Sequence, residues 1–220
     1  MNGSVAQPRR VVALIVLVVV AGLVVSSDTL HGGMGEVVLW SERLIARAPL
    51  AGMVAFVVLS MLSAMLAFFS SGLLSPVAIV AWGKMGTLVL LWLGWLLGGA
   101  LTYAVGRYLG RSAAGLMVDA DTLLAWEERV SSRSHFLHVL LLQLAMPSEV
   151  LGYVLGTLRY RFRNYIAVLA LSEIPYAVAV VYLGESFLAG NGLMFSLIGI
   201  ALIAVSAALY FLVRRVAGPQ

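Results

Sequence analysis

The feature that most constrains this chain is an almost wholly apolar run of 58 residues, Pro49–Gly106. A helix needs about 20 apolar residues to cross the hydrocarbon core of a bilayer, so this run holds two spans and a remainder. Over the whole chain, 62% of residues are hydrophobic and 11% are charged. A globule of 220 residues has too little interior to hide that much apolar surface. We therefore predict an integral membrane protein.

Proline and glycine divide this first apolar run. Pro76 breaks the hydrogen-bond ladder of a helix, and Gly83 permits a sharp turn. We predict a re-entrant hairpin over residues 49–85 that enters and leaves the membrane on one side. A full span, Thr87–Arg107, follows it.

The second half of the chain repeats this plan. Residues 134–159 are apolar at both ends but are interrupted by Gln143, Pro147 and Gly152. This pattern predicts a second re-entrant hairpin, followed by a full span, Tyr165–Leu183. Two such units of opposite orientation form an inverted repeat, whose broken tips meet near the bilayer midplane.

The flanking regions complete the predicted organisation. Residues 1–27 read as an N-terminal signal-anchor helix, and the alternative is a cleaved signal peptide. Residues 28–48 read as an external loop with a short amphipathic helix, and Gly110–Arg133 as an interfacial amphipathic helix. Residues 188–220 hold a final span, Leu193–Val213, and a tail. The predicted fold class is an all-α polytopic membrane protein containing this inverted repeat.

Charge placement supports the re-entrant hairpins. With the N-terminus inside, eleven cations fall on the cytoplasmic side and three outside, as the positive-inside rule requires. If the first hairpin crossed the membrane completely, every later cation would change sides. The cytoplasmic set is Arg9, Arg10, Arg107, Arg111, Arg129, Arg133, Arg159, Arg161, Arg163, Arg214 and Arg215, and the external set is Arg43, Arg47 and Lys84. Both termini are then cytoplasmic.

Short motifs in both halves resemble the VTT domain of the DedA superfamily, including its SNARE-associated, TVP-type members. The likeness runs over residues 49–187 and rests on the order of these motifs. They are Ser75-Pro76, Trp82-Gly83-Lys84-Met85-Gly86, Tyr103–Arg111, Met146-Pro147-Ser148-Glu149, Gly152-Tyr153, Glu173-Ile174-Pro175-Tyr176 and Tyr182-Leu183-Gly184. The sequence departs from the family where Gln143 occupies a place at which members often carry Arg.

The resemblance implies a protein of the bacterial inner membrane that transports or scrambles a lipid between leaflets. The lipid would be anionic, either a polyprenyl phosphate or a phospholipid, and membrane lipids would be its partners. The alternatives are a small-solute or ion transporter of the same architecture and a non-transporting membrane scaffold. We expect no cofactor. Homo-oligomerisation stays open.

Two carboxylates are the leading site candidates. Glu149 stands at the predicted tip of the second hairpin and Glu173 within a span, where an ionised group costs several kcal/mol unless it is paired. Burial raises the pKa of a carboxyl group, so either residue could carry a proton. The structural alternatives are that Glu149 caps a broken helix end and that Glu173 makes a hydrogen bond, pairs with Lys84 or shares a proton with Glu149.

Three further residues complete the candidate substrate or proton-coupling site. Lys84 either attracts a phosphate or fixes the depth of the hairpin at the interface. Gln143 either contacts the substrate or satisfies backbone groups, and Arg107 either gathers headgroups or anchors the topology. The proposed hairpin breakers are Pro76, Pro147, Gly83 and Gly152.

Other classes of function find little support in the sequence. Cysteine is absent, which excludes disulfides and thiolate chemistry. His135 and His138 lack a third ligand, so no metal site is predicted. No nucleophile–base set indicates an enzyme, and the net charge of +4 is too dispersed for nucleic-acid binding.

Overall fold

The computed structural model describes residues 16–23, 25, 45, 47–66, 71–110, 136–145 and 148–216, and the regular elements among these residues are all helical. Three of these helical stretches are long and apolar enough to cross a membrane, namely Ser71–Leu109, Phe162–Leu188 and Gly192–Leu209. The prediction of an all-helical polytopic membrane protein is confirmed at this level.

The first half of the chain contains two long helices. Helix α3, Pro49–Met65, is followed by a 3₁₀ turn, Ser71–Leu74, and then by α4, Ser75–Ala104. Pro76 stands in the first turn of α4, where the missing N–H costs no hydrogen bond, so it starts this helix and does not interrupt one. The break predicted at Gly83 is present, because Gly83 has φ 71° and ψ 173° and divides α4 into a short and a long part.

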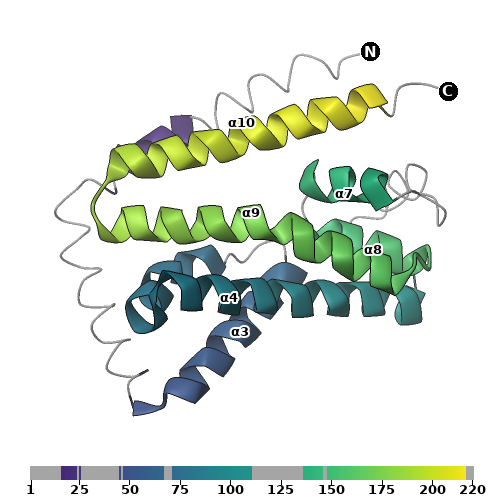
Figure 1. Ribbon diagram of the computed structural model, residues 1–220, viewed down its shortest axis with the longest axis horizontal. Coiled ribbons are helices and arrows are strands. Elements are labelled where there is room, and N and C mark those ends of the chain that lie inside the picture. The colour runs from purple at the N-terminus through teal and green to yellow at the C-terminus, as the bar shows by residue number, and fades with distance from the viewer. Residues whose placement is uncertain are drawn as a thin grey trace.

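The second half begins with two short helices. Helix α7, Phe136–Ala145, and helix α8, Ser148–Thr157, have 10 residues each. A helix of that length rises about 15 Å, which is half of the roughly 30 Å hydrocarbon core. Figure 1 shows both of them beside the N-terminal part of α9, Phe162–Leu188, and neither follows α9 over its full length. Between them stands Pro147, the break predicted in residues 134–159, which lies outside the described residues.

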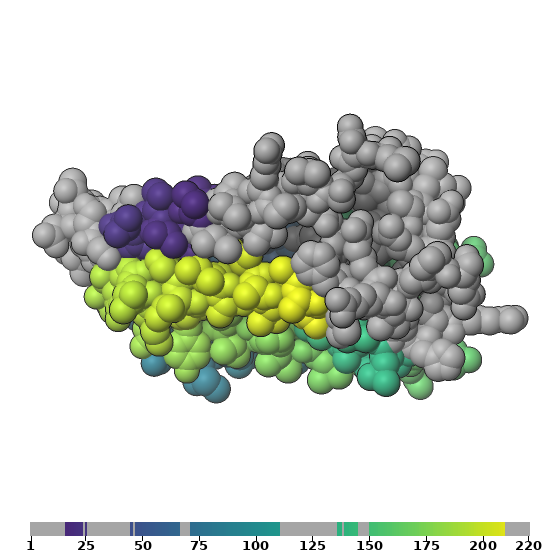
Figure 2. Space-filling view, turned by 90° about the horizontal axis from the view of Figure 1, so that it is seen from above, coloured from purple at the N-terminus to yellow at the C-terminus, as the bar shows by residue number. Residues whose placement is uncertain are grey.

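Two helices close the described part of the bundle. Helix α9 runs through Pro175 without ending, and a turn at Gly190, with φ 63°, leads into α10, Gly192–Val216. The described N-terminal helical residues lie against the first part of α10 in Figure 2, and Gly22 lies close to Ser196. The rest of the predicted N-terminal span, most of the external loop and, apart from Gly110, the predicted interfacial helix lie outside the described residues.

Small residues let α4 approach its neighbours closely. A Cβ on Gly98 would lie 2.5 Å from the Met61 carbonyl oxygen and 2.7 Å from the Ala64 Cβ on α3. A Cβ on Gly99 would instead lie 3.1 Å from the Tyr165 hydroxyl on α9. Successive glycines of α4 therefore pack against different halves of the chain, in the manner of membrane helix contacts.

A second close crossing joins α8 to the end of α4, which continues as a π-helix, Val105–Leu109. A Cβ on Gly156 would lie 2.9 Å from the Arg107 backbone nitrogen, and a Cβ on Gly106 would lie 3.1 Å from the Thr157 nitrogen. Backbone thus packs on backbone at this crossing. The adjoining buried core is formed by Tyr103, Val139, Leu142, Leu151, Leu155, Tyr160, Tyr165, Val168 and Leu169.

Candidate functional site

Glu173 is a buried carboxylate in the middle of α9, with 6% of its surface exposed. It is the one charged residue among the buried residues that the structure describes. Two tyrosines of the same helix, Tyr165 and Tyr176, lie within electrostatic range of it. Its side chain is therefore held inside the bundle, the position in which ionisable residues of membrane proteins are usually functional.

Gln143 is still more deeply buried and has 1% of its surface exposed. Within the described chain, neither its Nε2 nor its Oε1 has a hydrogen-bond partner. Gln143 lies near the end of α7, where the carbonyl of the next residue, Leu144, accepts a hydrogen bond from the Tyr176 hydroxyl. Tyr176 is about one turn from Glu173, so α7 ends at the level of Glu173.

Glu149 lies in the first turn of α8. Its place at the tip of a second hairpin stays a prediction. Its side chain lies outside the described part of the structure, and so does Pro147. Gly152 lies within α8 and does not break it. A Cβ there would lie 2.9 Å from the Tyr165 hydroxyl, so this glycine serves close packing and not a turn.

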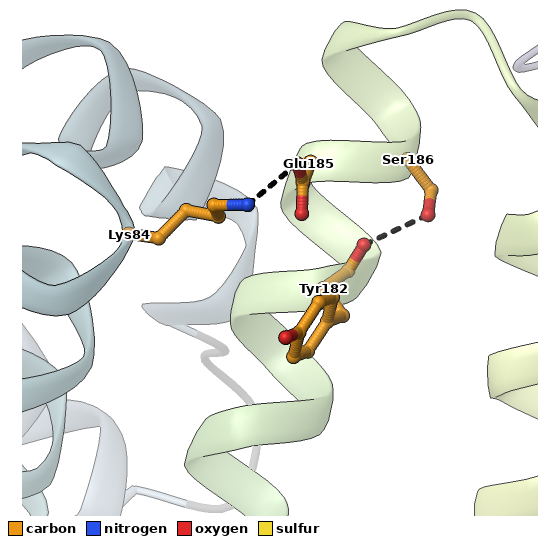
Figure 3. A network of polar contacts seen from close by, with 4 residues as sticks. All are labelled: Lys84, Tyr182, Glu185 and Ser186. Carbon is orange, nitrogen blue, oxygen red and sulfur yellow. Dashed lines mark hydrogen bonds and ion pairs between the residues drawn. The ribbon is translucent and has the colours of Figure 1, made fainter.

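Lys84 makes an ion pair that the sequence analysis missed. Its Nζ lies 2.9 Å from Glu185 Oε1 at the C-terminal end of α9 (Figure 3), and the two side chains are 52% and 41% exposed. The Nζ also lies 5.9 Å from the centre of the Tyr182 ring. Lys84 thus contacts Glu185, and not the Glu173 that we considered as its partner. The sequence analysis places Lys84 on the external side of the membrane, and it places the C-terminal end of the Tyr165–Leu183 span, next to Glu185, on the same side. This shared depth in the membrane could have predicted the pair.

Arg107 lies on the π-helix at the other end of α4 and is exposed. Its Nη1 donates to the Tyr103 hydroxyl over 3.3 Å, and this hydroxyl donates to the Tyr160 carbonyl oxygen. Arg107 is therefore tied, through one tyrosine, to the connection between α8 and α9. The same connection carries two exposed arginines, Arg159 and Arg161, and a third, Arg163, lies in the first turn of α9.

A group of buried serines near the start of α4 was not anticipated. The Ser71 backbone N–H donates to Ser63 Oγ over 3.0 Å, and Trp95 Nε1 donates to Ser71 Oγ over 3.1 Å. Ser60, one turn before Ser63 on α3, is 0% exposed, and its Oγ has no hydrogen-bond partner among the described residues. The hydroxyls of Ser63 and Ser71 thus accept hydrogen bonds from a backbone N–H and an indole where α3 and α4 meet.

Among the described residues, no three His, Cys, Asp or Glu side chains come together in a way that could hold a metal ion. His135 and the side chain of His138 lie outside this set, so the sequence prediction about them is not addressed.

The fold and its interior define a polytopic helical membrane protein with a buried carboxylate beside a helix break. Residues 69–186, which are more than half of the chain, match the VTT domain. The chain therefore belongs to the VTT-domain family, the DedA and SNARE-associated group of membrane proteins that are generally regarded as transporter-like. The match lies within the 49–187 region that showed the resemblance. No curated protein and no solved structure matches the chain.

Proposed function

We propose that this protein moves a phosphate-bearing lipid between the two leaflets of a membrane. The observation that carries the proposal is the buried Glu173 carboxylate, which lies level with the end of α7. A carboxylate inside a helical membrane bundle is costly and usually marks a substrate or proton pathway. Membership of the VTT family supports a transporter.

The proposed architecture is the inverted repeat of two re-entrant hairpins. Helices α7 and α8 are each too short to cross a bilayer, which supports a hairpin that returns to its own side. On the other side, α3 and the part of α4 before Gly83 form the matching hairpin. In Figure 1 helix α3 lies toward one end of the long helices and the pair α7 and α8 toward the other, which supports an inverted repeat.

The exposed arginines attract the phosphate groups of lipids. Arg107, Arg159, Arg161 and Arg163 lie at the end of the bundle that the charge analysis assigns to the cytoplasm. Each arginine near an anionic surface contributes about 1 kcal/mol of attraction. We propose that this cluster concentrates anionic phosphate groups at the cytoplasmic mouth of the path, in the inner membrane of a bacterium.

We further propose that Glu149 and Glu173 carry protons during transport. A buried carboxyl group can bind a proton when the path is empty and release it when the path is rehydrated or occupied. Substitution by glutamine keeps the size of each side chain but removes its titration. Glu149→Gln is then expected to abolish transport while the folded protein remains in the membrane, and Glu173→Gln to slow it severely.

The test is reconstitution of the purified protein into liposomes that carry a fluorescent phospholipid in one leaflet, with transfer measured by chemical quenching at two pH values. Glu185→Gln is a matched control, because Glu185 also lies on α9 but is exposed. It should transport like the wild type. Transfer no faster than in protein-free liposomes would disprove lipid movement. Normal transfer by both glutamine variants at every pH would disprove proton coupling.

A further inference from the structure

Four exposed arginines lie at the end of the bundle where α4, α8 and α9 meet. They are Arg107 on the π-helix, Arg159 and Arg161 in the connection between α8 and α9, and Arg163 in the first turn of α9. Within the described chain, none of these guanidinium groups has a carboxylate partner, since the ion pair of that part of the chain joins Lys84 to Glu185. Positive charge is therefore concentrated at this end without neutralisation.

Tyr103 joins Arg107 to the connection between α8 and α9. The Tyr103 hydroxyl accepts a hydrogen bond from Arg107 Nη1 over 3.3 Å and donates to the Tyr160 carbonyl oxygen. That carbonyl belongs to the peptide bond between Tyr160 and Arg161. The backbones are also in contact, because a Cβ on Gly156 would lie 2.9 Å from the Arg107 nitrogen. One tightly packed piece of backbone therefore carries the three arginines that we call the arginine triad, namely Arg107, Arg159 and Arg161.

Arg159 occupies a backbone position that favours glycine. Its N–H donates to the Gly156 carbonyl oxygen over 3.0 Å, and the Tyr160 N–H donates to the Leu155 carbonyl oxygen over 2.9 Å. These are the two hydrogen bonds of a Schellman motif, in which this position is left-handed, and Arg159 has φ 54°. Glycine adopts this conformation without steric cost, whereas arginine is strained there. Strain at a residue with an exposed charged side chain indicates that the side chain has a function.

Exposed apolar side chains stand beside the arginine triad. Tyr108 and Leu109, which are the next residues of the π-helix, are 81% and 64% exposed, and Phe162 at the start of α9 is 49% exposed. The Phe162 ring lies 5.3 Å from the Tyr103 ring, which joins this side chain to the same group. A ligand that contacts both kinds of side chain needs an anionic group and a hydrocarbon part. An anionic lipid has both, and a free phosphate ion has the first alone.

We propose that this end of the bundle is a fixed binding site for one anionic phospholipid. The arginine triad holds the lipid phosphate through paired hydrogen bonds, which a planar guanidinium forms and an ammonium does not. Tyr108, Leu109 and Phe162 contact the acyl chains. The bound lipid stays in place and stabilises the connection between α8 and α9. The site is therefore separate from the proposed transport and does not depend on it.

Arginines at the cytoplasmic end of membrane helices also fix the orientation of the chain, and that role needs positive charge alone. Lysine supplies the same charge, but it meets a phosphate as a point charge and lacks the planar pair of donors. Arg159→Lys and Arg161→Lys therefore keep the orientation and weaken a phosphate site. These two variants separate the proposed site from simple anchoring.

The first experiment measures thermal unfolding of the purified full-length protein in a neutral detergent, with and without dioctanoyl phosphatidylglycerol. This lipid should raise the Tm more than dioctanoyl phosphatidylcholine, because a ligand stabilises the state that binds it and the choline group cancels the negative charge. Arg159→Lys and Arg161→Lys should each weaken the apparent affinity for phosphatidylglycerol about tenfold, as expected for lost hydrogen bonds between charged groups. Equal effects of the two lipids, or unchanged affinity in both variants, overturn the site.

Arg159→Gly separates binding from stability. Its Tm without lipid should exceed that of the wild type, because glycine removes the strain, whereas its response to phosphatidylglycerol should fall. A full lipid response in Arg159→Gly would overturn the role of Arg159. Arg163→Lys is the matched control, since Arg163 is exposed at the same end but belongs to α9 and not to the connection. Its lipid response should be unchanged. A loss as large as that of Arg159→Lys would show diffuse attraction and overturn the site.

The second experiment identifies the ligand by native mass spectrometry. One phosphatidylglycerol should stay bound to each wild-type chain, and less of it to Arg161→Lys. In the unfolding assay, inorganic phosphate should raise the Tm less than the lipid does. An equal rise would assign the site to a free phosphate ion and overturn the lipid.

Variants that stop transport separate this site from the proposed function. Glu149→Gln should still retain the bound phosphatidylglycerol in native mass spectrometry. Loss of the lipid from this variant would mean that the bound lipid is the transported one, and the fixed site would be wrong. If no lipid moves in liposomes while binding depends on the arginine triad, the proposed transport is wrong and the site stands.

Discussion

Replacing Gly156 with alanine tests the crossing of α8 over the end of α4. The new Cβ would lie 2.9 Å from the Arg107 backbone nitrogen and closer still to the Tyr103 carbonyl oxygen, whereas ordinary contact begins at 3.4 Å. Both neighbours are backbone atoms, so neither can rotate away as the end of a side chain would. The two helices would have to separate by about 1 Å, which strains the packed core beside them.

The expected cost follows from two opposing effects. Overpacking of a well-packed site costs about 1–3 kcal/mol, and contact with two rigid backbone atoms places this site at the upper end, about 2–3 kcal/mol. Alanine stabilises the helix by about 1 kcal/mol relative to glycine, because it is the better helix former. We expect Gly156→Ala to lower the free energy of unfolding by about 1–2 kcal/mol. Gly86→Ala is the control, since its Cβ would meet only the Trp82 Cβ at 3.0 Å within the same α4, and we expect it to be neutral or stabilising.

The assay is denaturant-induced unfolding of the purified protein in mixed micelles, followed by tryptophan fluorescence and by circular dichroism. The reasoning fails if Gly156→Ala is as stable as the wild type or as Gly86→Ala. That result would mean that α8 does not approach the end of α4 as closely as described.

Three further predictions follow. A double-mutant cycle with Lys84→Ala and Glu185→Ala should give a small coupling that vanishes in 1 M salt, because both side chains of this pair are exposed; a large coupling independent of salt would contradict this. Arg159 has φ 54°, so Arg159→Gly should raise stability by about 1 kcal/mol in thermal unfolding, and an unchanged Tm would show that this residue is not strained. Trp92 Nε1 donates to the Ala170 carbonyl oxygen over 3.0 Å, so Trp92→Phe should cost about 1 kcal/mol in the same assay, and a neutral result would exclude this hydrogen bond.

Local sequence signals predicted one helix break, at Gly83, correctly. Gly83 has the positive φ that only glycine adopts easily. Pro147, the break predicted for the second half, lies outside the described residues. The role predicted for Pro76 was wrong, because it stands in the first turn of α4. Proline is favoured in the first turn of a helix and also breaks a helix interior, and the sequence alone does not distinguish these two positions. Gly152 was taken as a break for a similar reason, since glycine serves both turns and close helix contacts.

Contacts between distant residues could not be predicted in the same way. The Lys84–Glu185 pair joins residues 101 positions apart, and the hydrogen bond from Tyr165 to Gly99 spans 66 positions. Such pairs depend on how helices rotate about their axes, which hydropathy does not fix. The burial of Glu173 was foreseeable because an acid in a span must avoid lipid. That Gln143 has no hydrogen-bond partner within the described chain was not foreseeable, since it depends on every neighbour.

Few residues of the apolar part of α10 are buried within the described structure, in contrast to α4 and α9. Leu197 and Val205, for example, are 54% and 56% exposed. In a bilayer such a face meets acyl chains, so a nitroxide attached there would disturb no packing. Oxygen and nickel-complex accessibility at these two positions would then report the immersion depth of the whole bundle and fix where each hairpin tip lies relative to the lipid midplane.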